Sequence, residues 1–199
     1  MSEQTKQVKK PFDMKKEILS WVVYILFGLV LAYALVGFVG QRTCVDGESM
    51  MNTLNDGDNL IVDKLSYRFS DPERFDIIVF PPYVDKYNSL WPFGVGDIYI
   101  KRIIGLPGET IQIDENGTIY IDGEVLEEDY GAETIKKPGR ASEPITLGED
   151  EYFVMGDNRN NSTDSRSERV GNVNRAQIIG RAWARIWPLS EIGFLKHGR

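Results

Sequence analysis

The stretch that decides the fold is Tyr99-Ile100-Lys101-Arg102-Ile103-Ile104-Gly105-Leu106-Pro107-Gly108, a β-branched run that ends in two glycines and a proline. Isoleucine and tyrosine favour strands, whereas glycine and proline end them. Because side chains alternate along a strand, Lys101 should share one face with Tyr99 and Ile103, and Arg102 should point to the other face. The stretch therefore predicts a strand that carries two adjacent cations in opposite directions.

Segments of the same kind occur at short intervals along residues 41–199. They are bounded by turn-forming residues, and Asn116-Gly117 between two of them is typical of a β-hairpin. We expect strands at residues 59–62, 76–80, 97–104, 110–113, 118–121, 152–155 and 182–186. Loops are expected at residues 83–96 and in the acidic stretch 122–144, which we interpret as a solvated surface. This spacing predicts a mostly β fold, with an antiparallel sheet or a barrel.

An apolar segment precedes this β-rich region. Residues 18–40 contain no charged side chain, and as a helix they would be about 34 Å long, enough to cross the hydrocarbon core of a bilayer. A buried core helix would carry a polar stripe, and a cleaved signal peptide would have a shorter apolar region. We therefore expect an uncleaved transmembrane helix.

The charges on either side of this segment indicate its orientation. Residues 1–17 hold five lysines and three acidic residues, whereas residues 41–199 hold 18 basic and 27 acidic residues. The positive-inside rule places the lysine-rich end in the cytoplasm. We expect a single-pass protein of the cell membrane, with a cytoplasmic tail (1–17), a membrane helix (18–40) and an extracytoplasmic domain (41–199).

The composition argues against several classes of function. The net charge of −7 argues against nucleic acid as a partner, because phosphate binding needs clustered cations. A single cysteine cannot form an internal disulfide or a multi-cysteine zinc site, and the single histidine, His197, is third from the C-terminus. We therefore expect no histidine-dependent triad, no metal and no other cofactor. Acid–base chemistry would have to use lysine, carboxylates or tyrosine.

Lys101 is a candidate general base. If the strand face that it shares with Tyr99 is buried, desolvation lowers the pKa of the lysine and yields a neutral amine that can accept a proton near neutral pH. Arginine cannot be deprotonated, so Arg102 cannot take this role. The spacing by itself favours the commoner alternative, which is an exposed lysine on a strand.

Two polar segments are further candidates. Gly47-Glu48-Ser49-Met50-Met51 contains a serine nine residues beyond the apolar segment, and that serine fits either a nucleophile or a turn residue. Residues 156–166 are dense in Asp, Asn, Ser and Arg, and their spacing does not match a calcium-binding EF-hand loop. They fit either a polar loop that is braced by Asp–Arg pairs and orients a neighbouring group, or a tight turn with no further role.

These three segments, in this order behind one N-terminal anchor, resemble the bacterial type I signal peptidases, membrane-anchored serine proteases that remove signal peptides from exported proteins. The resemblance is strongest at Ser49-Met50-Met51 with Thr53-Leu54, at residues 99–108 and at residues 156–166. It implies a mostly β, signal-peptidase-like barrel or sheet as the catalytic domain. The implied partners are the signal peptides of exported preproteins and the lipid bilayer, and we expect a monomer.

The resemblance also implies a role for each candidate residue. Ser49 would be the nucleophile and Lys101 the general base of a Ser–Lys dyad, an established variant of the serine-protease triad. Ser162 would orient the lysine amine, and Asp164 and Arg166 would brace the site. The dyad would attack the carbonyl group of the last residue of the signal peptide and form an acyl-enzyme.

The groups that contact the substrate follow from the same resemblance. Some members use a serine hydroxyl where this chain has Gly47, so the backbone N–H groups of Gly47 and Ser49 would form the oxyanion hole. The family cleaves after small residues at the last and third-last positions of the signal peptide. The shallow apolar pockets for these residues would be lined by Val45, Met50, Leu54, Tyr99 and Ile100. The substrate would bind as an extended strand beside residues 97–101.

Two positions depart from the family pattern. Asn52 stands where proline is usual, and Phe75 stands where glycine usually precedes Asp76. We expect the first to loosen the turn that carries Ser49 and the second to alter packing near the pocket. Neither change removes a proposed catalytic group.

Three other functions are open at this stage. A Ser–Lys peptidase of the same fold could process a single partner, such as a pilin-like protein. A membrane-tethered peptide-binding module without catalysis would have no need of Ser49, Lys101 and Ser162 together. A scaffold whose acidic face binds a partner would explain the charge but not the three segments.

Overall fold

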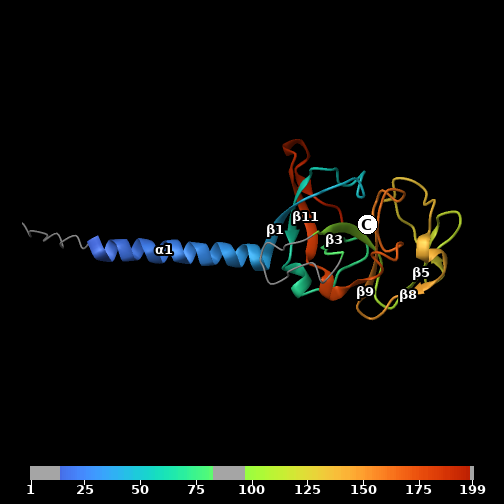
Figure 1. The fold of residues 1–199 in the computed structure, drawn as a ribbon, viewed down its shortest axis with the longest axis horizontal. Helices are drawn as coiled ribbons and strands as arrows, with labels where there is room; N and C mark the ends of the chain where they lie inside the picture. The colour runs from blue at the N-terminus through green and yellow to red at the C-terminus, as the bar shows by residue number, and fades with distance from the viewer. Residues whose placement is uncertain (1–13, 83–96, 198–199) are drawn as a thin grey trace, which may run out of the picture.

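A single helix and a β-rich domain make up the computed structural model, which describes residues 14–82 and 97–197 (Figure 1). The helix α1 (Met14–Ala34) continues as the π-helical η1 (Leu35–Val39). No side chain of α1 is buried, and the span Met14–Gly37 is long and apolar enough to cross a membrane. The helix begins before the predicted residue 18, because lysine and glutamate at residues 15–17 are good helix formers.

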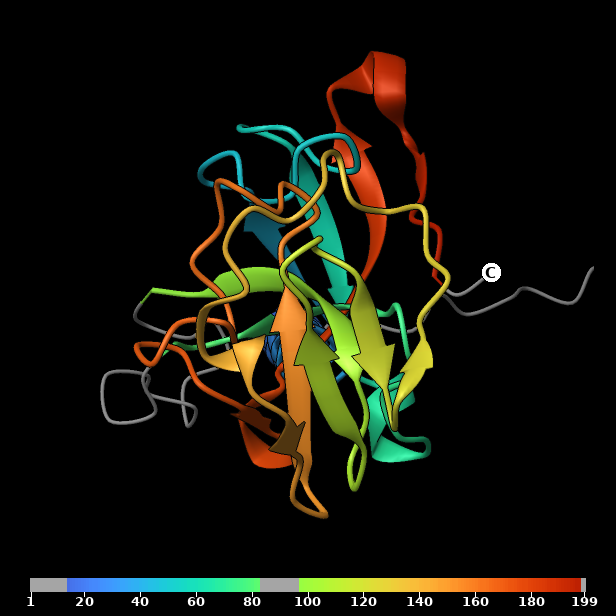
Figure 2. The same ribbon diagram turned by 90° about the vertical axis from the view of Figure 1, so that its right-hand side faces the viewer.

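Two antiparallel sheets form the domain, and Figure 2 shows them with α1 seen end-on behind. The larger sheet has the order β1-β2-β11-β3-β4-β9-β10, with β12 paired to β11, and the smaller has the order β7-β6-β5-β8. The strands are β1 (Gly40–Cys44), β2 (Asn59–Asp63), β3 (Ile77–Phe80), β4 (Tyr99–Gly105), β5 (Thr110–Ile113), β6 (Ile119–Ile121), β7 (Glu124–Val125), β8 (Ile145–Thr146), β9 (Glu151–Met155), β10 (Val173–Asn174), β11 (Gly180–Trp187) and β12 (Gly193–Phe194). Short 3-10 turns are η2 (Ser66–Arg68), η4 (Gly139–Ser142), η5 (Arg175–Gln177) and η6 (Leu189–Glu191).

The predicted mostly β class is confirmed, and every predicted strand is present with small shifts at its ends. The predicted hairpin is confirmed as well, because Ile113 pairs with Ile119 across the turn that contains Gly117. Sequence patterns missed β1, which is polar, and the two-residue strands β7, β8, β10 and β12, which are too short for alternation. The loop predicted at residues 83–96 lies outside the described residues.

Strand β4 is buried on both faces, and this decides the environment of its two cations. Ile103 packs in an apolar cluster on one side, whereas Ile100 and Ile104 enter two other clusters. Lys101 is only 4% exposed and Arg102 is fully buried. The alternative of an exposed strand lysine is therefore wrong.

The acidic stretch 122–144 is mostly loop, as predicted, but it is not simply a solvated surface. Its Ala132 N–H donates to the Asp157 carbonyl oxygen (3.0 Å), and Glu128 pairs with the buried Arg159 at 2.6 Å. The stretch is thus attached to the polar loop at residues 156–166. Charge pattern alone does not reveal such pairing, because the partner lies far away in the sequence.

Phe75 changes the packing at the start of β3. Its φ of 70° lies in the left-handed region that favours glycine, so a bulky side chain here carries backbone strain. The ring is buried in the cluster beneath the smaller sheet and lies 5.1 Å from the Tyr130 ring, centroid to centroid. Aromatic packing offsets the strain at this position.

We predict that Gly117→Ala destabilises the domain by about 2 kcal/mol or more, because the φ of Gly117 is 82° and an added Cβ would lie 2.5 Å from the Ile135 carbonyl oxygen. Gly123→Ala is the matched control, since its φ is 84° but nothing lies within 4 Å of the added Cβ. The control should lose only about 1 kcal/mol. Urea unfolding in detergent measures both, and equal losses would contradict the prediction.

Candidate active site

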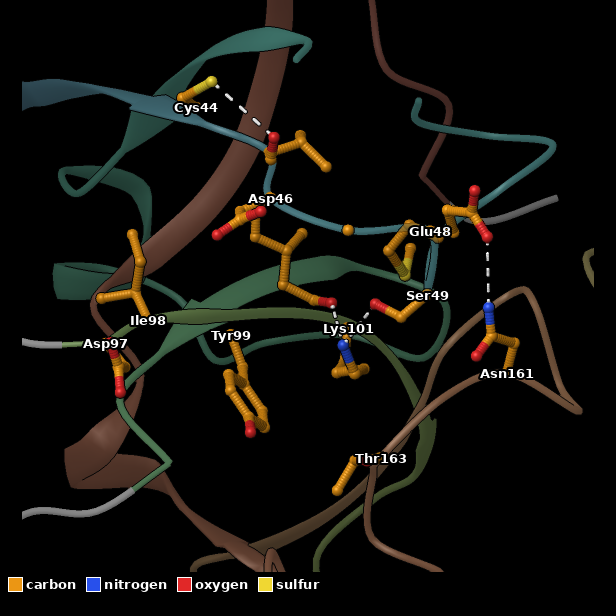
Figure 3. Close-up of a pocket in the computed structure, with 14 residues that line it drawn as sticks. Cys44, Asp46, Glu48, Ser49, Asp97, Ile98, Tyr99, Lys101, Asn161 and Thr163 are labelled. Atoms are coloured by element: carbon orange, nitrogen blue, oxygen red, sulfur yellow. Dashed lines mark hydrogen bonds between the residues drawn. The ribbon is translucent and has the colours of Figure 1, made fainter. Parts of the chain in front are cut away.

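Ser49 and Lys101 are in direct contact at the wall of a pocket (Figure 3). Lys101 Nζ lies 2.7 Å from Ser49 Oγ and 2.9 Å from the Ile100 carbonyl oxygen. Lys101 is fixed because β4 pairs with β3 and with β9. Ser49 lies in the turn after β1, and its carbonyl oxygen accepts a hydrogen bond from the Asn158 N–H at 3.1 Å. The two predicted catalytic residues are therefore brought together.

Burial changes the protonation of Lys101. Desolvation lowers the pKa of Lys101 from its usual 10.5 to about 8, while the carboxylates of Asp164 and Asp157 act in the opposite direction. A lysine with this pKa is a free amine in about one molecule in ten at pH 7. A neutral amine at 2.7 Å from a hydroxyl can accept its proton, so the arrangement can activate Ser49 as a nucleophile.

A cleft of about 500 Å³ opens beside this pair (Figure 3). It is lined by residues 44–50, by residues 97–101, and by Asn161 and Thr163 of the polar loop. Strand β9 pairs with β4 only from Arg102 onward, so on that side the edge of β4 at residues 99–101 has no strand partner among the described residues. An extended peptide could add to this edge through backbone hydrogen bonds.

Four of the five predicted pocket residues line the cleft, namely Val45, Met50, Tyr99 and Ile100. Leu54 does not, because it is fully buried in the apolar core behind Met50. Asp97 and Ile98 also line the cleft, within the segment predicted to bind the substrate, and sequence reasoning did not assign the remaining lining residues Cys44, Asp46, Glu48, Asn161 and Thr163. These residues lie next to the predicted site residues in the sequence, and this proximity could have identified them.

Ser162 lies at the site but does not hold the lysine. Its Oγ is buried and makes no hydrogen bond within the described residues, and the second partner of Lys101 Nζ is the Ile100 carbonyl oxygen. The loop of Ser162 nevertheless packs tightly on the serine turn. A Cβ on Gly156 would lie 2.3 Å from the Ser49 carbonyl oxygen and 2.4 Å from Ser162 Oγ, so only glycine fits there.

Asp164 and Arg166 form the expected brace. Arg166 donates two hydrogen bonds to the Asp164 carboxylate, at 2.9 and 2.8 Å, and Asp164 also accepts from the Gly156 N–H at 3.1 Å. Both side chains are buried. The pair therefore ties the beginning of the polar loop to its end, as bidentate Arg–carboxylate pairs can.

A second buried ion pair lies beneath the serine turn, and sequence reasoning did not assign it. Arg102 donates to both carboxylate oxygens of Asp157, at 2.8 and 2.7 Å, and to the Phe75 carbonyl oxygen at 2.8 Å. Thr53 Oγ1 donates to the same carboxylate at 2.5 Å. Arg102 thus connects β4 with the serine turn and with the polar loop.

The two predicted oxyanion donors differ in their availability. The Gly47 N–H already donates to the Asp56 carboxylate at 2.8 Å, so it is not free for a substrate oxygen in this arrangement. The Ser49 N–H makes no hydrogen bond within the described part of the chain. Of the two, Ser49 is the donor that can bind an oxyanion without rearrangement.

Asn52 lies in the serine turn and has an unusual backbone conformation. Its φ of 79° lies in the left-handed region, which asparagine tolerates, whereas the proline ring holds φ near about −65°. The serine turn of this chain is therefore built with a backbone that proline could not adopt. It is closed by the Thr53 and Leu54 N–H groups, which both donate to the Met50 carbonyl oxygen at 3.0 and 2.8 Å.

His197 lies away from the cleft. Within residues 14–82 and 97–197, no group of three or more His, Cys, Asp or Glu side chains could hold a metal ion. His197 lies beside Asp76, 3.4 Å from its carboxylate, and does not line the cleft.

Comparisons with known proteins find similar sequences over most of this chain. The family model described as "Signal peptidase, peptidase S26" matches residues 18–187. A signal peptidase I from Leptolyngbya laminosa is 42% identical over 167 residues, which cover 84% of this chain and 78% of that protein. A signal peptidase I from Bacillus amyloliquefaciens is 35% identical over 194 residues, 94% of this chain and 97% of that protein. The crystal structure of a signal peptidase I from Enterococcus faecalis V583 is 36% identical, covers 56% of this chain and 97% of its own, and has a TM-score of 0.41.

The burial of Lys101 should be visible in the stability of the protein. The pKa of Lys101 is about 8 in the folded protein and 10.5 in the unfolded chain, so between these pH values the folded state binds fewer protons. The free-energy cost of burying the ammonium group is therefore fully present below pH 8 and is lost as the pH rises to 10.5. We predict that Lys101→Met raises the free energy of unfolding by about 3 kcal/mol at pH 6 to 7. Urea unfolding at several pH values measures this gain, and a gain that did not shrink above pH 8 would contradict it.

Proposed function

Because this chain belongs to the peptidase S26 family of signal peptidases, we propose that it removes signal peptides from secreted preproteins with Ser49 as nucleophile and Lys101 as general base. Family membership makes it a serine peptidase that acts on signal peptides. The single observation that carries the assignment of the two residues is the 2.7 Å contact between Lys101 Nζ and Ser49 Oγ at a buried lysine.

The first half of the reaction would form an acyl-enzyme. Neutral Lys101 takes the proton from Ser49 Oγ as the oxygen attacks the carbonyl carbon of the last residue of the signal peptide. The negative charge that develops on the carbonyl oxygen is bound by the Ser49 N–H. The tetrahedral intermediate then collapses, and the protonated Lys101 gives its proton to the amine that leaves with the mature protein.

The second half would release the signal peptide. Lys101 is again neutral after the amine has left, and it takes a proton from a water molecule that attacks the ester on Ser49. The second tetrahedral intermediate breaks down when Lys101 returns that proton to Ser49 Oγ. Ser162, whose Oγ is buried near this pair without a partner, would serve as an additional hydrogen-bond acceptor for the lysine once substrate fills the cleft.

Substrate selection would follow from the walls of the cleft. The signal peptide would lie as a strand against the free edge of β4, which positions its scissile bond at Ser49. Val45, Met50 and Ile100 are almost completely buried, so they offer shallow apolar surfaces that exclude bulky side chains. This supports cleavage after small residues at the last and third-last positions of the signal peptide.

The N-terminal helix would keep the enzyme at its substrates. We assign residues 1–17 to the cytoplasm, a single span of residues 18–40 to the cell membrane and residues 41–199 to the extracytoplasmic side, working there as a monomer. The apolar span Met14–Gly37 supports the membrane helix, and the five lysines of residues 1–17 support its orientation. A signal peptide that enters the same bilayer would meet Ser49, which lies nine residues beyond the proposed span 18–40.

We predict that Ser49→Ala and Lys101→Ala each reduce cleavage of a preprotein by at least about 10³-fold, because each removes one half of the proton-transfer pair. Lys101→Arg should fail as well, since arginine stays protonated. Lys196→Ala, which removes an exposed lysine, is the control and should cleave normally. Processing in detergent or liposomes, followed by gel mobility, measures this; cleavage by Ser49→Ala would refute the assignment.

The pH dependence offers an independent check on the base. Lys101 must be neutral to accept a proton, and its pKa is about 8, so kcat/KM should rise with pH and reach half its maximum near pH 8. The pH–rate profile of a synthetic signal-peptide substrate measures this. A profile that is flat between pH 6 and 9 would argue against a lysine base.

A further inference from the structure

We propose that residues 128–136, here named the strap, position the Ser49–Lys101 pair, and that Tyr130 is the positioning residue through which the strap acts. The strap is the part of the acidic loop 122–144 that packs against the polar loop at residues 156–166. This inference rests on the proposed function, because the pair that it positions is the proposed dyad.

Tyr130 covers the buried Arg102. The guanidinium carbon of Arg102 lies 3.7 Å from the centroid of the Tyr130 ring, which is close contact for a cation over an aromatic face. The same ring packs against Phe75, whose carbonyl oxygen accepts a hydrogen bond from Arg102 at 2.8 Å. Tyr130 therefore holds the guanidinium group from one side while Phe75 and Asp157 hold it from others.

Arg102 connects this contact to both members of the pair. It is the neighbour of Lys101 on β4, and its partner Asp157 accepts a hydrogen bond from Thr53, in the turn that begins at Ser49. The residue after Asp157, Asn158, binds the backbone on both sides: its N–H donates to the Ser49 carbonyl oxygen and its side chain to the Glu48 carbonyl oxygen, each at 3.1 Å. A displaced Arg102 would thus move the serine turn.

Other contacts fasten the strap to the polar loop over its whole length. Glu128 pairs with Arg159, whose side chain is only 2% exposed, and Arg159 Nε donates to the Gly156 carbonyl oxygen at 3.1 Å. The strap backbone passes so close at Gly131 that an added Cβ would lie 3.3 Å from the Arg159 guanidinium. Further along, Asn160 donates to Glu133 and to the Thr134 carbonyl oxygen.

Through Arg102, the strap would also influence how strongly the Asp157 carboxylate raises the pKa of Lys101. Burial lowers the pKa of Lys101, whereas the carboxylates of Asp164 and, to a smaller extent, Asp157 raise it. The guanidinium of Arg166 pairs with Asp164, and that of Arg102 offsets the charge of Asp157 at close range. If Tyr130 is lost and Arg102 becomes less well fixed, more of the Asp157 charge acts on Lys101. Lys101 would then keep its proton to higher pH and act as a base less readily.

The experiment compares Tyr130→Leu with Tyr130→Phe in the full-length protein in detergent. Leucine removes the aromatic face, and we expect kcat to fall about tenfold and the acid limb of kcat/KM to move to higher pH. Phenylalanine keeps the face and should restore both. Tyr120→Leu is the matched control, because Tyr120 is a half-buried tyrosine of β6 in the smaller sheet whose hydroxyl donates to Asp114.

A second measurement follows the pKa of Lys101 directly and does not depend on catalysis. NMR titration of labelled lysine side chains, with Lys101 assigned through Lys101→Ala, should show a higher pKa for Lys101 in Tyr130→Leu than in the wild type. An unchanged titration and an unchanged pH–rate profile would overturn the strap proposal, as would equal effects of Tyr130→Leu and Tyr120→Leu. Failure of the wild type to cleave, with Lys101 still shifted in Tyr130→Leu, would instead overturn the proposed function.

Discussion

The burial of one ammonium group is the constraint on which the rest of this structure depends. Lys101 stands on a strand that is covered on both faces, and the loss of water lowers its pKa to about 8. Holding a charged lysine in this position costs the fold about 3 kcal/mol at neutral pH. The proposed chemistry depends on the lowered pKa that this burial produces, because an exposed lysine would remain protonated and could not accept a proton from Ser49.

Two buried ion pairs hold the segments that surround Ser49 and Lys101 in place. Arg102–Asp157 lies beneath the serine turn, and Arg166–Asp164 closes the polar loop, so each cation has a fixed carboxylate partner. Such pairs add little net stability compared with apolar packing, but breaking one of them leaves an uncompensated buried charge. Their value here is geometric: Arg102–Asp157 holds the serine turn and the polar loop against β4, and Arg166–Asp164 ties the two ends of the polar loop together.

Two residues near the site adopt a backbone conformation that favours glycine. Asn52 and Phe75 both have positive φ, and each is supported by its surroundings: Asn52 lies in a turn closed by backbone hydrogen bonds, and Phe75 packs on Tyr130. Tyr130, which belongs to the acidic loop, also contacts the guanidinium group of Arg102. The acidic loop at residues 122–144, whose composition indicates a solvated surface, therefore packs against residues that surround the site.

Periodicity and composition alone determined the apolar helix, the strands with clear alternation and the Gly117 hairpin, because each depends on residues that are neighbours in sequence. Local patterns left the roles of Ser49 and Lys101 open, and the resemblance of the three motifs to signal peptidases assigned them. Only the tertiary structure decided that Lys101 is buried, that Leu54 lies behind the cleft, that the Gly47 N–H is occupied by Asp56 and that Arg102 pairs with Asp157. These outcomes depend on which distant segments cover a strand face or a backbone group, and no pattern within one segment contains that information.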